Sequence, residues 1–203
     1  MLWFIPLGLF SQELSNLDYV SPFHDGLAAV KKGTQWAFID TKGNVAIDFR
    51  SDLVVDKQSN RACCPAGTAH DYPFFSNGRS MIVSKENGIS HYGYIDTKGQ
   101  VVIEPQFINA TPFHENGAIV LEVVKETLGR NEALGKNVVT YSYNELFIDT
   151  NGNTLTYLRG PFNLLYSKEK MKTPPNITSK CLNGVVIAIQ SNDGLWKIKS
   201  IEQ

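Results

Sequence analysis

Two places in the sequence pair a histidine with a carboxylate, at His24-Asp25 and at His114-Glu115. A histidine beside a carboxylate can act as a general base or ligate a metal ion. Both dipeptides stand where the chain is expected to turn, and short polar side chains at a turn satisfy free backbone groups. The equivalent turn at Ser76-Asn77 has no histidine. We therefore expect these dipeptides to form turns and to hold no metal.

Three aspartates, Asp40, Asp96 and Asp149, recur in the same local context. A ring of carboxylates could bind calcium or supply an acid/base pair. Each aspartate begins a turn that ends in a glycine three residues later, and Asp is favoured there because its side chain accepts hydrogen bonds from the turn backbone. We expect the turn role for all three.

Four aromatic residues, Trp36, Tyr92, Tyr94 and Trp196, form a further candidate set. They could line a surface that stacks on sugar rings or peptide side chains. They could equally form a buried aromatic layer, and at strand periodicity the buried layer is the commoner arrangement. We expect the buried layer.

Established catalytic motifs are incomplete in this chain. Residues 129–137 resemble a phosphate loop, but five residues separate the glycines instead of four, and Asn137 replaces the required Ser or Thr. His114-Glu115 begins like a zinc-protease motif, but Ala118 stands where the second histidine belongs. The sequence therefore predicts no catalytic residue, no metal site and no cofactor, and it assigns no binding residues.

The composition is that of a folded chain rich in strands. Of 203 residues, 42% are apolar and 19% are charged, so neither disorder nor a fibrous structure is expected. Lys and Arg number 19 against 20 Asp and Glu, a net charge of −1, which provides no basic field for nucleic acid. Val and Ile outnumber Ala, which favours pleated sheets over helices.

The elements that must position these residues form an internal repeat. Three copies run from Pro22 to Gly43, from Pro73 to Gly99 and from Pro112 to Gly152. A degraded fourth begins at Pro161-Phe162, resumes at Gly184 and closes at Trp196. Each copy has an extended Pro-Phe step, a glycine, a short apolar run, a polar tip, an aromatic-Ile-Asp strand and a turn. A third strand follows the turn, so each copy predicts a three-stranded antiparallel meander.

One meander cannot bury both faces of its own sheet, so neighbouring copies must stack or fan around an axis. The predicted fold is therefore all-β, with repeated antiparallel three-stranded meanders in a propeller-like or curved β-solenoid arrangement. Residues 12–203 are expected to form a single domain of about three and a half units.

These motifs resemble the WG-repeat proteins, a bacterial family also described through KWG repeats. The resemblance is clearest over residues 23–43 and 92–107 and covers most of residues 20–160. The Trp-Gly pair itself is replaced by Trp36-Ala37, Tyr92-Gly93 and Glu145-Leu146. The family has no common catalytic activity. The resemblance implies an interaction or cell-envelope repeat that is often exported.

Three inserts lengthen the copies, at residues 51–71, 122–142 and 168–180. Residues 122–142 are expected to prolong one hairpin with its tip at Glu126 to Lys136, and Lys168 to Lys180 is expected to form an exposed loop. Inserts on a repeat scaffold often carry the individual function, so these are the first candidates for a binding region.

Residues 1–10 are apolar and uncharged, and a polar stretch follows directly. They resemble the apolar region of a bacterial signal peptide, and residues 1–11 would then be its remnant, although no Lys or Arg precedes them. As a first strand, they would instead indicate a cytoplasmic protein. If the chain is exported, Cys181 could pair with Cys63 or Cys64, and the odd number of cysteines leaves at least one thiol over.

The expected function is a non-catalytic repeat module at the bacterial cell envelope, with a binding or scaffolding surface for a protein or glycan and no membrane span. The oligomeric state stays open. The alternative is a hydrolase whose carboxylate or His site is built from loops of different repeats. Two carboxylates ~5–9 Å apart in one cleft would favour the hydrolase, whereas separate turn carboxylates would favour the module.

Overall fold

A computed structural model describes residues 14–55, 71–183, 185–191 and 193–201 of the chain. Within these ranges the protein is nearly all β, as predicted, and the only helical element is the 3₁₀ turn η1 (Lys170–Lys172). All the sheets are antiparallel. The predictions for residues 1–11 and for Cys63 and Cys64 lie outside the described residues.

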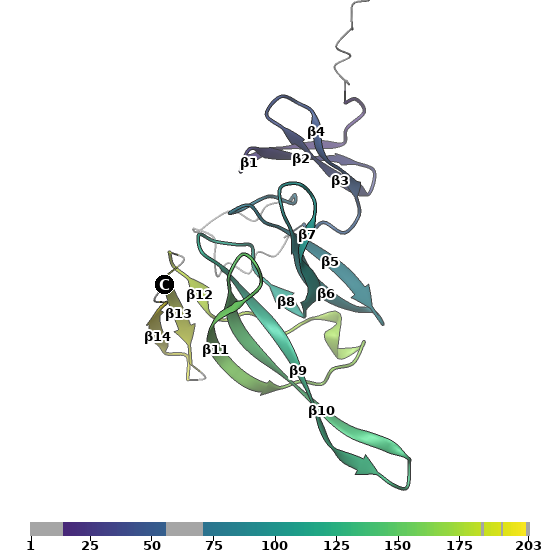
Figure 1. Ribbon diagram of the computed structural model, residues 1–203, viewed down its shortest axis with the longest axis vertical. Helices are drawn as coiled ribbons and strands as arrows, with labels where there is room; N and C mark the ends of the chain where they lie inside the picture. Colours follow the sequence, from purple (N-terminus) through teal and green to yellow (C-terminus); the bar gives the residue numbers. More distant parts are fainter. Residues whose placement is uncertain (1–13, 56–70, 184, 192, 202–203) are drawn as a thin grey trace, which may run out of the picture.

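The strands form four sheets that follow one another along the chain (Figure 1). The first sheet has four strands: β1 (Tyr19–His24), β2 (Leu27–Lys32), β3 (Gln35–Asp40) and β4 (Val45–Arg50). The second has three: β5 (Ser80–Glu86), β6 (Ile89–Ile95) and β7 (Val101–Phe107). The third has four: β8 (Asn109–Ala110), β9 (Ala118–Asn131), β10 (Lys136–Ile148) and β11 (Thr154–Asn163). The fourth has three: β12 (Lys180–Cys181), β13 (Val186–Gln190) and β14 (Trp196–Ser200).

The strand pairing has the same register in every sheet, which confirms the repeat. Equivalent cross-strand pairs are Ala28 with Ile39, Ser80 with Ile95, Ala118 with Ile148, and Ile187 with Lys199. The meanders predicted from the sequence are present, with one addition. A further strand enters each of three sheets, as β1, which contains Pro22-Phe23, as β8, which precedes Pro112-Phe113, and as β12. In the second sheet, Leu53 makes the corresponding bridge to Ile82. The chain therefore crosses into each new sheet as an edge strand.

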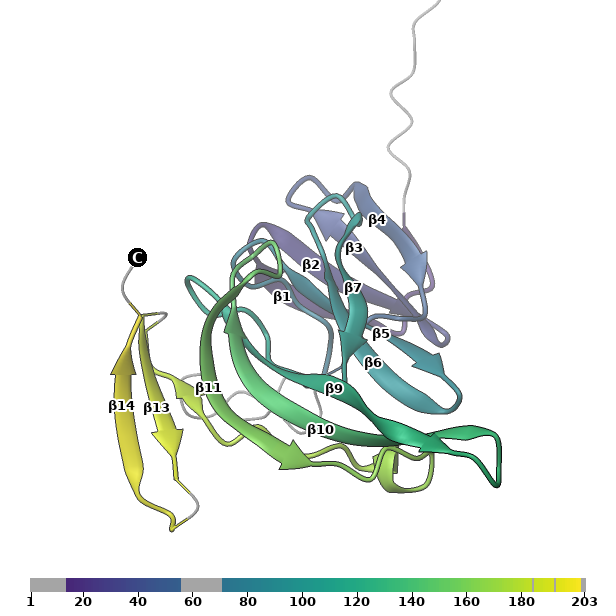
Figure 2. The same cartoon turned by 60° about the horizontal axis from the view of Figure 1, so that its bottom comes forward.

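The first three sheets follow one another down the long axis of the molecule, and the fourth lies beside the third (Figure 1). Of the two predicted arrangements, this is a curved stack. In Figure 2 the third sheet is curled into a half-barrel formed by the long strands β9, β10 and β11. The hairpin β9–β10 extends well beyond the other strands, as the insert at residues 122–142 predicted, and its tip is shorter than expected, at residues 132–135.

The core is divided among the junctions between successive sheets. At the first junction the ring of Phe38 meets that of Phe75 edge to face, with centroids 4.7 Å apart. At the second, Tyr94 and Phe113 repeat this contact at 4.8 Å. Both separations lie in the favourable range for edge-to-face rings. At the third junction, Phe147 and Cys181 share one buried cluster. Each sheet therefore buries one face only with the help of the next.

Turn glycines fit tightly into the same junctions. An added Cβ at Gly99 would lie 3.0 Å from the Ile47 side chain of the preceding sheet, and one at Gly152 would lie 3.3 Å from Ile103. Gly43, which has the same place in the first sheet, has nothing within 4 Å of an added Cβ. The glycine is thus a packing requirement at the junctions, in addition to its positive φ.

The fourth unit begins later than the sequence predicted. Pro161-Phe162 lies inside β11, so it belongs to the third sheet, and the crossing strand of the fourth is β12. The registers of β13 and β14 place Trp196 at the position of Trp36. The expected exposed loop at Lys168 to Lys180 is also wrong, because Met171, Ile177 and Ser179 are buried there.

We expect alanine at the three equivalent turn glycines to destabilise the protein to different degrees. Gly43→Ala should cost about 1–2 kcal/mol from left-handed backbone strain alone. Gly99→Ala should cost more, because its Cβ would also push on Ile47, and Gly152→Ala should fall between them. Urea denaturation measures the free energy of unfolding of each variant. Equal losses at Gly43 and Gly99 would contradict the junction contact.

Candidate functional site

The recurring aspartates are each engaged in their own turn, as expected. Asp40 Oδ1 accepts hydrogen bonds from the backbone N–H groups of Lys42 and Asn44, at 2.8 and 2.9 Å. Asp96 and Asp149 accept the equivalent pairs of bonds at 2.8–2.9 Å. These carboxylates therefore lie at three separate turns, and each one organises its own turn.

The turn hydrogen bonds also favour the ionised carboxylates. The backbone N–H of Asn44 is the main cause that lowers the pKa of Asp40. At Asp149, partial burial acts in the opposite direction, but hydrogen bonds from Asn153 and neighbouring backbone groups still hold the pKa below its usual value. A lowered pKa suits a structural carboxylate and opposes a role as a proton donor near neutral pH.

The histidine dipeptides also occupy turns. Asp25 and Glu115 both have positive φ values, 50° and 49°, which mark them as turn residues. Asp25 additionally joins two sheets, because its Oδ2 accepts a 2.8 Å hydrogen bond from the backbone N–H of Gly78 in the next sheet. His24 shares a 3.1 Å hydrogen bond with the Tyr72 hydroxyl, whereas Nδ1 of His114 is buried without a hydrogen-bond partner.

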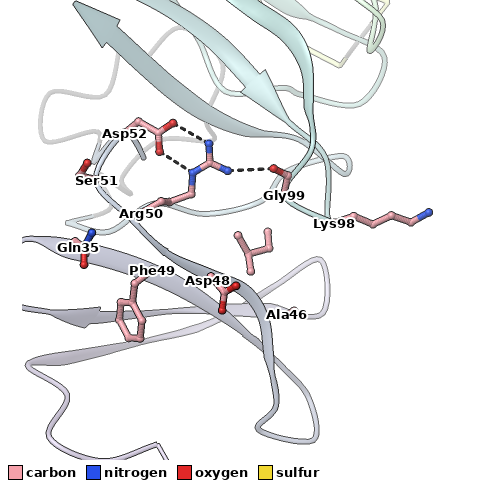
Figure 3. A pocket seen from close by; sticks show the side chains of 10 residues that line it. Gln35, Ala46, Asp48, Phe49, Arg50, Ser51, Asp52, Lys98 and Gly99 are labelled. Carbon is pink, nitrogen blue, oxygen red and sulfur yellow. Dashed lines mark hydrogen bonds and ion pairs between the residues drawn. The ribbon is translucent and has the colours of Figure 1, made fainter.

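A shallow groove lies at the junction of the first two sheets (Figure 3). It has a volume of about 640 Å³. Arg50 forms a two-pronged ion pair with Asp52, at 2.6 and 2.7 Å, and donates a third bond to the carbonyl of Gly99 at 3.1 Å. The hydrogen bond from Arg50 is the main cause that lowers the pKa of Asp52. In Figure 3 Lys98 points away from this pair. Arg50 and Asp52, the charged groups at the centre of the groove, are therefore paired with each other and not with Lys98.

Of the four aromatic residues expected to form a buried layer, two are buried. Trp36 and Tyr94 are buried, and Tyr92 is half-buried. Trp196 is exposed, with the Lys180 ammonium 4.9 Å from its ring centroid, so the expectation of burial is wrong there. The register places Glu145 at the corresponding position of the third sheet.

Glu145 is the polar residue that the sequence did not single out for a role. Its side chain is 2% exposed, and it accepts hydrogen bonds from the backbone N–H groups of Thr178 and Ser179, at 3.1 and 2.8 Å. A buried carboxylate is tolerated only with such partners. Glu145 therefore fastens the segment before β12 to the third sheet. The one sign of this role in the sequence was that Glu145 stands where the repeat otherwise has an aromatic residue.

The hairpin arm, residues 122–141 of β9 and β10, is the most accessible candidate site. Among the described residues, β8 pairs with β9 as far as Leu121, and β11 pairs with β10 from Ser142 onward. At the base of the arm the carbonyl of Tyr141 still accepts a 2.9 Å hydrogen bond from the backbone N–H of Leu164. Beyond this bond the arm is a two-stranded ribbon that projects from the body in both views (Figures 1 and 2). Leu128, Leu134 and Val138 are exposed along it. The arm therefore offers open strand edges together with apolar side chains.

The described part of the chain has no cluster of three or more His, Cys, Asp or Glu that could hold a metal ion. No helix in the same ranges has the length and apolar character needed to cross a membrane.

The fold and its turns define a class, a stack of repeated antiparallel sheets joined by crossing strands. Residues 16–35, 36–57 and 92–122 match the family model of the WG containing repeat. Three segments of the chain are thus similar to the WG repeat, as the sequence motifs indicated. No curated protein and no solved structure matches the chain.

The second sheet explains the glycine of the family's Trp-Gly pair. Gly93 has this position, and an added Cβ there would lie 2.4 Å from the carbonyl oxygen of Ile103. The register between β6 and β7 shifts at this point, which brings the β7 backbone close. In the first sheet the position is Ala37, which is fully buried. In the second sheet the glycine is therefore needed because the β7 backbone leaves no room for a Cβ.

We expect Asp52→Asn to destabilise the protein at neutral pH by about 0.5–1 kcal/mol, the range for a partly exposed ion pair. The pKa of Asp52 is lower in the folded state than in the unfolded state, so the pair stabilises the fold above the unfolded pKa of about 3.9. This contribution is lost as the pH falls through the folded-state pKa. The difference from the parent protein should therefore shrink on acidification.

Thermal unfolding from pH 7 down to about pH 2 follows this difference. The matched control is Asp48→Asn, which removes an exposed carboxylate from the same groove. An Asp52→Asn effect that does not depend on pH would show that the ion pair is not its origin.

Proposed function

We propose that this protein is a non-catalytic binding module whose hairpin arm recognises an extended segment of a partner polypeptide. The observation that carries the proposal is the open two-stranded ribbon at residues 122–141. Unpaired strand edges offer backbone N–H and C=O groups to a further strand, and added strands are a common mode of peptide recognition.

The side chains of the arm support a polypeptide ligand. Leu128, Leu134 and Val138 provide exposed apolar contacts beside the open edges. A two-stranded ribbon alone is marginally stable in water, so a third strand from a partner would stabilise it. Charged residues of both signs, among them Glu126 and Arg130, keep the arm from presenting a single-sign field.

The turn carboxylates support a non-catalytic role. Asp40, Asp96 and Asp149 each use their oxygens on their own turn backbone. Arg50 and Asp52 in the groove of Figure 3 satisfy each other. The hydrolase alternative needs two carboxylates facing one cleft. The three turn aspartates belong to separate turns, and of the two carboxylates that line the groove, Asp48 and Asp52, the second is held in the ion pair with Arg50.

The proposal includes export to the bacterial cell envelope, and its support is the apolar sequence of residues 1–10. We expect the mature protein from a native host to begin close to residue 12. N-terminal sequencing of protein from the envelope fraction measures this. A mature chain that begins at Met1 and stays in the cytoplasmic fraction would contradict export.

For the binding proposal, the full chain is screened against libraries of extended peptides and of glycans. We expect peptide ligands whose affinity falls at least tenfold in the Leu128→Asp/Val138→Asp variant, because charge at these sites opposes apolar contact and edge pairing. The matched control is Leu155→Asp, an exposed residue of β11 outside the arm. Its affinity should be unchanged.

Two other results of this screen would contradict the binding proposal. Ligands that bind both variants as well as the parent would place the binding surface elsewhere. Hydrolysis of any glycan or peptide in the screen, abolished by Asp96→Asn or Asp149→Asn, would establish the hydrolase instead.

A further inference from the structure

Two positions recur at every junction between sheets and can be compared across the whole stack. The entering position lies on the segment that leads into each sheet, and in the second, third and fourth sheets it contacts the preceding sheet. It is occupied by Phe23, Phe75, Phe113 and Cys181. The receiving position lies on β3, β6, β10 or β14, and in the first three sheets it faces the following sheet. It is occupied by Phe38, Tyr94, Phe147 and Ile198.

Exposure separates the inner positions from the two outermost ones. The entering side chains of the second, third and fourth sheets are 1%, 2% and 5% exposed, whereas Phe23 is 50% exposed. The receiving side chains of the first three sheets are 1%, 0% and 0% exposed, whereas Ile198 is 59% exposed. Each entering residue of the second, third and fourth sheets therefore packs against a receiving residue of the sheet before it. Phe23 at one end of the stack and Ile198 at the other end remain exposed.

Neighbouring residues at the two ends follow the same pattern. At the first sheet, Val20 is exposed beside Phe23, while the small residues behind them, such as Ala28 and Val30, are buried. The exposed apolar surface at this end is thus the rim formed by Phe23 and Val20. At the last sheet, Trp196 is exposed beside Ile198, although its equivalent Trp36 is buried by the following sheet.

The last sheet also has an open edge. Strands β3, β6 and β10 each pair with a further strand, whereas β14 pairs only with β13 among the described residues. At the other end, Gly43 lacks the isoleucine contact that Gly99 and Gly152 make with a preceding sheet. In Figures 1 and 2, β14 lies at the periphery of the molecule and apart from the first sheet, so one molecule cannot join its own two ends.

We propose that a second copy of this chain occupies these ends, with Phe23 and Val20 of one copy packed on Ile198 and Trp196 of the next. A second copy is the fitting partner because it carries both halves of the contact, in the same positions that form the inner junctions. A head-to-tail contact of this kind is heterologous, so it builds either a closed ring or an open chain of molecules, and an open chain leaves one free end of each type. The contact is separate from the hairpin arm.

Sedimentation velocity of the full 203-residue chain over a range of concentrations tests this proposal. We expect the average mass of the parent protein to rise with concentration beyond that of a dimer. Phe23→Asp and Ile198→Asp should each remain monomeric when studied alone, because self-association should be at least tenfold weaker than in the parent protein. Mixed in equal amounts, they should form a dimer and nothing larger, because each variant retains the end that the other has lost.

Leu165→Asp, an exposed residue between β11 and η1, is the matched control and should associate like the parent. Circular dichroism confirms that each variant is folded, and Phe23→Ser with Ile198→Ser replaces the charged pair if either one unfolds. A parent protein that is monomeric up to about millimolar concentration, the weakest range of specific association, would overturn the proposal. A pair of blocked variants that fails to form a dimer would also overturn it, since it would indicate a symmetric interface or none.

Discussion

Each sheet of this protein has two faces to bury and too few strands to bury either alone. The edge-to-face contacts of Phe38 with Phe75 and of Tyr94 with Phe113 show the solution, because each pair takes one ring from each of two successive sheets. The apolar core is consequently divided among three junctions. Stability of such a stack is a sum of nearest-neighbour terms, and an outermost sheet always has a face without a neighbour of its own kind.

The turns are shaped by the same constraint. A turn that begins with aspartate and ends with glycine closes each third strand, and in two sheets its glycine rests on an isoleucine of the preceding sheet, Ile47 or Ile103. A larger residue there would separate the sheets, and a residue other than Asp would leave two backbone N–H groups without their acceptor. Recurrence of Asp and Gly along the chain therefore follows from packing, and a catalytic role is not needed to explain it.

Local features of the fold could be predicted from the sequence, and features that depend on neighbours could not. The strands and the Asp-to-Gly turns were predictable because alternation and turn chemistry act within a few residues. Pro161-Phe162 was misleading, since the same dipeptide that marks a crossing strand elsewhere lies within β11 here. Burial of Trp36 and exposure of Trp196 depend on whether a sheet follows, which their equivalent positions in the strand pattern do not encode. Glu145 stood out only as a replacement in the Trp-Gly pair, and its anchoring role could not be predicted because its partners, Thr178 and Ser179, lie far along the chain.

The position of the arm also follows from how the stack is built. Lengthening β9 and β10 at their shared tip adds cross-strand pairs and leaves the register of Ile119 with Phe147, near the junction, unchanged. A hairpin tip is therefore one place where this scaffold can gain length without loss of core contacts. Binding residues placed there can vary while the junctions stay fixed, because the two sets of residues share no contacts beyond the base of the ribbon.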